Sequence, residues 1–82
     1  MPEPMNCKIE VGAMFGGRTK LRPLWFLWNK RKYQVKEITY GWVTKEGKAT
    51  VYHFSVRDEN DNLFEITYNN ESLVWRVLSV EG

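Results

Sequence analysis

Hydrophobic and polar residues alternate along most of this chain, with the period of two that is typical of β-strands. Short groups of glycine, asparagine and aspartate interrupt the alternation, and no stretch has the periodicity of an amphipathic helix. Strands are therefore expected over residues 8–14, 24–28, 33–43, 50–57, 63–68 and 73–80. Because the connections between them are short, consecutive strands are expected to pair as antiparallel hairpins.

Turn length predicts the register of two of these hairpins. Across the polar loop 58–62, the symmetric register pairs inward residues as Val56–Phe64, Phe54–Ile66 and Tyr52–Tyr68. Across a loop of residues 29–32, the expected pairs are Trp28–Tyr33 and Phe26–Val35, with Trp25 facing Lys36 on the other side of the sheet.

The inward-facing positions change phase within the long strand 33–43. Tyr33 and Val35 belong to one set, whereas the apolar residues from Ile38 onward belong to the other. A slip of one residue near positions 36–37 would reconcile them, and this is what a β-bulge produces in a bent strand. The last strand, 73–80, is apolar in both phases, so its inward face stays open.

These patterns predict an all-β fold: a single small domain over residues 1–82, built as an antiparallel meander of five to six strands. The phase change favours a strongly curved sheet or a small barrel over a flat sheet. Residues 1–6 are expected to form a flexible N-terminal arm.

Composition narrows the class of protein without naming a function. The chain has 82 residues, of which 43% are hydrophobic and 27% charged, as in a soluble globular domain with one core. No apolar run approaches the roughly 20 residues that span a bilayer, and residues 1–5 do not resemble a secretory signal. Cys7 is the only cysteine, which excludes an internal disulfide and favours a reducing compartment. A cytoplasmic protein without a membrane partner is expected.

Charge is distributed unevenly and concentrates in one segment. Residues 1–41 carry eight basic and three acidic side chains, whereas residues 42–82 carry four and seven. The segment 18–36 contains no acid, and aromatic residues lie between its basic ones. Positive charge interleaved with flat rings is typical of a groove for single-stranded nucleic acid. The candidate nucleic-acid-binding residues are Trp25, Lys30, Arg31, Lys32, Lys36, Arg18, Lys20 and Arg22.

A structural interpretation of the same segment remains open. In it, Phe26, Trp28 and Tyr33 fill the core of a small domain, and Lys36 covers Trp25 in a cation–π contact of about 0.5–1 kcal/mol. Alternation supports the assignment of these three aromatic residues to the core, so the functional case rests mainly on Trp25 and the charges around it.

No catalytic residue, metal site or cofactor is predicted. His53 is the only histidine and is expected on the outward face of its strand, which excludes a multi-histidine metal site. In the loop 58–62, Asp58 matches the first ligand position of a calcium-binding loop. Leu63 occupies the position where such a loop needs glycine, so a plain hairpin loop is expected. Glu65 is expected to form a surface ion pair with Arg57.

A set of aromatic and apolar positions resembles a known family. The spacing Pro23-x-x-Phe26-x-Trp28-x-x-x-x-Tyr33-x-Val35 is followed by Trp42, by Tyr52-x-Phe54-x-Val56, by Leu63-Phe64-Glu65-Ile66 and by Trp75-Arg76-Val77. Over residues 8–80 it resembles a family of small uncharacterised bacterial β-domains, some of which are similar to a C-terminal module of Y-family DNA-polymerase-like proteins. The resemblance implies no activity, but it implies an association with nucleic-acid-processing proteins.

Two functions are consistent with these observations. The first is a non-enzymatic β-module that binds single-stranded nucleic acid weakly, or accompanies a nucleic-acid-processing protein, through the basic and aromatic hairpin. The second is a protein-interaction or self-association module that uses an exposed apolar patch or an open sheet edge. Either a monomer or a weak homodimer is expected.

Overall fold

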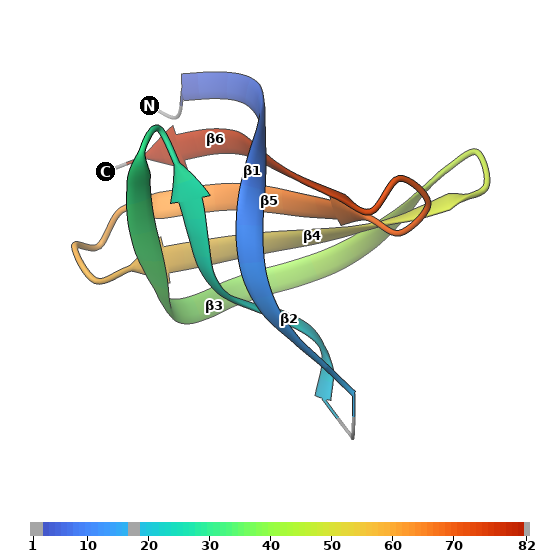
Figure 1. Cartoon of the computed structure of the whole chain (residues 1–82), viewed down its shortest axis with the longest axis horizontal. Coiled ribbons are helices and arrows are strands. Elements are labelled where there is room, and N and C mark those ends of the chain that lie inside the picture. Colours follow the sequence, from blue (N-terminus) through green and yellow to red (C-terminus); the bar gives the residue numbers. More distant parts are fainter. Residues whose placement is uncertain (1–2, 17–18, 82) are drawn as a thin grey trace.

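The computed structural model describes residues 3–16 and 19–81 as six antiparallel strands that close into a small barrel (Figure 1). The strands are β1 (Glu3–Gly16), β2 (Thr19–Trp28), β3 (Arg31–Glu46), β4 (Ala49–Asp58), β5 (Leu63–Asn69) and β6 (Val74–Glu81). Each pairs with the next in the chain, and β6 returns to β1. The described residues form no helix, and hence none that could span a membrane. The expected all-β meander is confirmed, as a barrel of six strands.

Two long strands, β1 and β3, are each shared between two neighbours. The first part of β1, up to Ile9, pairs with β6, and the part from Glu10 onward pairs with β2. Residues 3–6, expected in an arm, belong to the part of β1 that pairs with β6. In β3, residues 31–34 pair with β2 and residues 35–46 with β4. Strands that bend from one partner to the next allow so few strands to close a ring.

The expected phase change in β3 is a real irregularity of the sheet. The register between β3 and β4 shifts between Val35 and Glu37, and again between Ile38 and Tyr40. The first shift lies at the predicted position. Each leaves one residue of β3 without a partner on β4, which bends the strand and turns Ile38 toward the core.

The predicted register of the β2–β3 hairpin is wrong by two residues. Phe26 faces Tyr33 rather than Val35, and Trp25 faces Gln34 rather than Lys36. The turn consists of two residues only, Asn29 and Lys30, with φ angles of 54° and 64°. Two successive residues with positive φ make a tight turn whose twist matches that of the flanking strands, so pairing starts directly after the turn.

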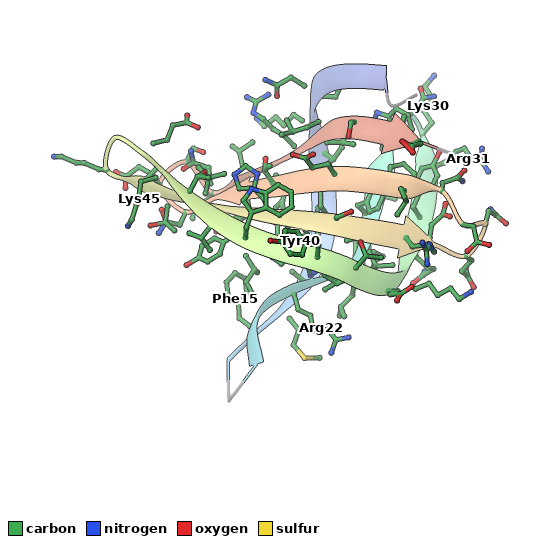
Figure 2. All side chains as sticks on the ribbon, turned by 180° about the vertical axis from the view of Figure 1, so that it is seen from behind. Phe15, Arg22, Lys30, Arg31, Tyr40 and Lys45 are labelled. Atoms are coloured by element: carbon green, nitrogen blue, oxygen red, sulfur yellow. The ribbon has the colours of Figure 1, made fainter. Side chains whose placement is uncertain are left out.

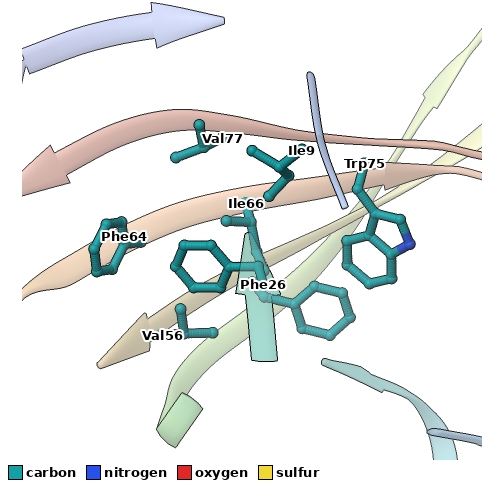
Figure 3. Packing of buried hydrophobic residues seen from close by; sticks show 8 residues of the cluster. Ile9, Phe26, Val56, Phe64, Ile66, Trp75 and Val77 are labelled. Carbon is teal, nitrogen blue, oxygen red and sulfur yellow. The ribbon is translucent and has the colours of Figure 1, made fainter. Parts of the chain in front are cut away.

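The core lies inside the barrel and is built largely on the β4–β5 pairs. The three predicted β4–β5 pairs, from Val56–Phe64 to Tyr52–Tyr68, are confirmed. Figure 3 shows Phe26 and Phe64 within the buried cluster. The ring of Phe26 meets Phe64 edge-on at 4.9 Å between centroids and stacks on the half-buried Tyr33 at 5.2 Å. The buried cluster consists of Ile9, Phe26, Phe54, Val56, Phe64, Ile66, Trp75 and Val77.

Residues from both alternating sets of β6 face the core, because the strand carries a bulge. Trp75 and Val77 are buried, and Val77 faces Ile66 on β5. The next pairs toward the end of β6 are Ser79 with Glu65 and Val80 with Phe64, so Leu78 has no partner on β5. The bulge moves Val80 to the inward side, where it packs against the core.

The β4–β5 connection is the hairpin loop that the sequence predicts. The buried carboxylate of Asp58 accepts hydrogen bonds from the backbone N–H groups of Asn60 and Asn62, each at 2.9 Å, and from the side-chain amide of Asn62 at 3.1 Å. This carboxylate therefore holds the turn.

The β2–β3 pairing closes the barrel at one end only. Pairing between β2 and β3 extends only from the turn to Trp25 and Gln34. Beyond this point the β1–β2 hairpin and the β3–β4 hairpin project in different directions (Figure 1). The molecule thus has a closed end around the β2–β3 turn and an open end between the two projecting hairpins.

Candidate nucleic-acid interface

Trp25 lies on the outer face of β2, in a position that depends on a glycine. Its partner on β1 is Gly12, and a methyl group at Gly12 would overlap the indole. The Nζ atom of Lys32 lies 4.8 Å from the centroid of the Trp25 ring. The expected cation–π contact therefore exists, but Lys32 makes it instead of Lys36, because of the shorter turn. Trp25 is half-buried by these neighbours, and only part of its ring surface remains free.

Lys30 and Arg31 lie at the closed end of the barrel, in and directly after the β2–β3 turn (Figure 2). Both side chains are exposed. The guanidinium carbon of Arg31 lies 5.5 Å from the centroid of the Tyr33 ring. The turn thus presents two adjacent cations above the aromatic end of the core.

A hollow of about 540 Å³ lies beside this turn. β1 contributes Lys8 and Glu10 to its lining, and the β2–β3 hairpin contributes Leu27, Trp28 and Lys30. The Trp28 ring is half-buried, and it packs against Phe64 with 6.1 Å between centroids. Two ammonium groups, one carboxylate and an indole therefore border one concave surface, which can accommodate a flat base with its phosphates beside the lysines.

The cations around the hollow form no ion pair among the described residues, although the carboxylate of Glu10 lies in the same lining. Among the described residues, the ion pairs involve His53 and Arg57 but none of Lys8, Lys30, Arg31 or Lys32. We call these four residues the basic rim. Their charges remain available to phosphate groups.

The other candidate residues do not join the basic rim. Arg22 pairs with Met14 near the open end, and Figure 2 shows it well separated from Lys30 and Arg31. Lys36 is exposed at the first irregularity of β3. Arg18 lies outside the described residues, and Lys20 is described only as part of the backbone of β2. The candidate residues that the structure describes therefore do not form one surface, because Arg22 and the Lys30–Arg31 pair lie at different ends of the barrel.

Sequence reasoning missed two residues of the hollow. Lys8 precedes the basic segment in the chain, and only the bend of β1 brings it beside the turn. Trp28 was assigned to the core, which is correct for one part of its ring. A lysine at the start of the first strand was the only available signal for Lys8, and this is too common to be specific.

The outer face of β4 differs from expectation in its ion pairs. Arg57 pairs with Glu37 on β3 at 3.0 Å, not with Glu65, because Glu37 is directly opposite it in the sheet. Glu65 lies 3.9 Å from Nδ1 of His53. His53 faces outward as expected, but Trp42 covers it, with the two rings stacked at 4.9 Å between centroids.

No protein-family model, curated protein or solved structure matches this chain. The fold and its geometry define the class: a single-domain, six-stranded antiparallel barrel, paired fully at one end and split at the other.

Proposed function

We propose that this domain is a non-enzymatic module that binds single-stranded nucleic acid at the basic rim. The observation that carries the proposal is the hollow at the β2–β3 turn, which combines the indole of Trp28 with the ammonium groups of Lys8 and Lys30. One base enters the hollow against Trp28, and the phosphates on either side of it meet the lysines. Base–aromatic stacking contributes about 1–3 kcal/mol per base, and it does not require a particular sequence.

Lys32 and Arg31 extend the surface that contacts the bound nucleic-acid strand. Each is held near a ring, Lys32 over Trp25 and Arg31 over Tyr33. A side chain that is already oriented loses less conformational entropy when it binds a phosphate. The resemblance to a module of Y-family DNA-polymerase-like proteins adds to the proposal, because such a partner would hold the domain close to single strands.

The proposal predicts weak, salt-dependent binding. If about three phosphates are contacted, affinity for a single strand falls roughly tenfold to twentyfold between about 50 mM and about 200 mM salt. Fluorescence anisotropy with a labelled oligonucleotide of ten thymidines measures this. The indole N–H resonance of Trp28 should shift on binding in an NMR titration.

A matched pair of double variants tests the site. Lys8→Gln with Lys30→Gln removes two charges at the hollow, and Lys45→Gln with Lys48→Gln removes two at the β3–β4 turn. The first pair should weaken binding about tenfold, and the second less than about twofold, since only the first loses phosphate contacts. Equal losses would mean that binding follows net charge and not the hollow. No detectable binding at low salt would overturn the proposal.

A further inference from the structure

The side of β3 that faces away from β4 is an unpaired sheet edge. β2 pairs with β3 only at residues 31–34, and among the described residues no strand pairs with positions 36–46 on this side. The described hydrogen bonds of turns and loops do not involve this edge either. A long unpaired edge presents free N–H and C=O groups that can pair with another strand.

An apolar cavity of about 750 Å³ opens beside this edge. Phe15 and Leu21 of the β1–β2 hairpin line one side of it, and Gly41 and Val43 of β3 line the other. Tyr52, Phe54 and Tyr68 also line it. Phe15 is 65% exposed and Val43 55%, although both border an apolar space. Exposed apolar residues grouped around a cavity indicate a binding site rather than incidental surface.

We infer that this cleft binds an extended peptide of another protein, which adds as a strand to the edge of β3 and inserts apolar side chains into the cavity. This inference goes beyond the nucleic-acid proposal and concerns the opposite end of the barrel. In strand addition, backbone hydrogen bonds supply much of the affinity, and a pocket for alternate side chains supplies the specificity. The free edge and the cavity lie side by side, as this mode requires.

The charges around the cleft select an acidic peptide. Lys36 lies near one end of the free edge, and Arg22 is exposed on β2 across the cleft. At the other end, Lys45 donates to the Thr50 hydroxyl at 2.8 Å and is followed by the exposed Glu46. Glu37, the acid beside Lys36, is already paired with Arg57. The charges left without a partner among the described residues, Lys36 and Arg22, therefore complement a peptide with an apolar centre and acidic flanks.

The test uses a synthetic peptide of alternating valine and threonine with two glutamates at each end, labelled with fluorescein. It should bind saturably with a dissociation constant below about 1 mM, measured by anisotropy. Amides in residues 36–46 should gain protection from hydrogen exchange. One control peptide carries lysines at the ends in place of the glutamates, and a second carries methyl groups on alternate amide nitrogens. Both should bind at least about fivefold more weakly.

Gly41→Val is the informative protein variant, because a Cβ there would meet only ordinary contacts, 3.5 Å to the carbonyl oxygen of His53 and 3.9 Å to Cδ1 of Phe54. The added side chain occupies part of the cleft beside the free edge, and peptide affinity should fall about tenfold. Val43→Asp, at an exposed position, is the second variant should the first fail to fold. Lys8→Gln with Lys30→Gln is the control and should leave peptide affinity unchanged.

Several results would overturn the inference. Equal binding of the N-methylated peptide would exclude strand addition, and undiminished binding to a folded Gly41→Val or Val43→Asp variant would exclude the cleft. Absence of binding at millimolar peptide would exclude this ligand class. A dimer in sedimentation velocity that Gly41→Val dissociates would identify a second copy as the occupant. None of these results bears on the oligonucleotide experiment, because that concerns the other end of the barrel.

Discussion

The two ends of this barrel use similar residues in opposite ways. At the closed end, Phe26 and Phe64 are fully packed, and the cations lie outside on the basic rim. At the open end, Phe15 and Tyr68 surround an apolar cavity, and the edge of β3 is unpaired. The difference arises where β2 stops pairing with β3. An aromatic residue thus stabilises the fold or borders a binding site according to whether the strands around it are paired.

The largest expected effect is a difference in stability between a truncated aromatic residue at the closed end and one at the open end. Phe26→Ala should lower the free energy of unfolding by about 3–5 kcal/mol, because its ring is completely buried among other rings. Phe15→Ala should cost less than about 1 kcal/mol, because its ring is largely exposed. Urea unfolding followed by circular dichroism measures both. Equal costs would show that the open end belongs to the same packed core as the closed end.

The second effect compares two strand glycines. Gly12→Ala should destabilise by about 1–3 kcal/mol, because the new methyl group would overlap the indole of Trp25. Gly41→Ala should be neutral or stabilising by up to about 1 kcal/mol, because its methyl group enters the open cleft and the unfolded chain loses freedom.

A double-mutant cycle identifies why Gly12→Ala destabilises the protein. In the background of Trp25→Ala, the cost of Gly12→Ala should largely disappear. A cost that persists in that background would mean that Gly12 is needed for its backbone and not for the space it leaves to the indole.

The smallest effect compares two lysines of β3. Lys32→Gln should cost about 0.5–1 kcal/mol through loss of the contact with Trp25. Lys36→Gln, where no such contact exists among the described residues, should change stability by less than about 0.5 kcal/mol. Thermal unfolding resolves this difference if both variants are measured side by side. A larger cost for Lys36→Gln than for Lys32→Gln would mean that Lys36, and not Lys32, contacts Trp25, as the longer turn predicts.

The sequence alone determined the local features of this protein. Period-two alternation located the strands, since side chains of a strand alternate between faces whatever the strand packs against. The polar loop before Leu63 determined the β4–β5 register, and the phase change near Lys36 located a bulge. Each of these follows from residues that are close together in the chain.

The tertiary structure decided the features that depend on how long strands divide between partners. The two-residue turn at Asn29 moved the β2–β3 register, which gave Trp25 the cation of Lys32. The bend of β1 brought Lys8 beside Lys30, although they are far apart in the chain. The early end of β2–β3 pairing opened the cleft and left the edge of β3 free. Alternation specifies which face a residue occupies, but not how far two strands stay together, because that balance is set by the packing of the whole barrel.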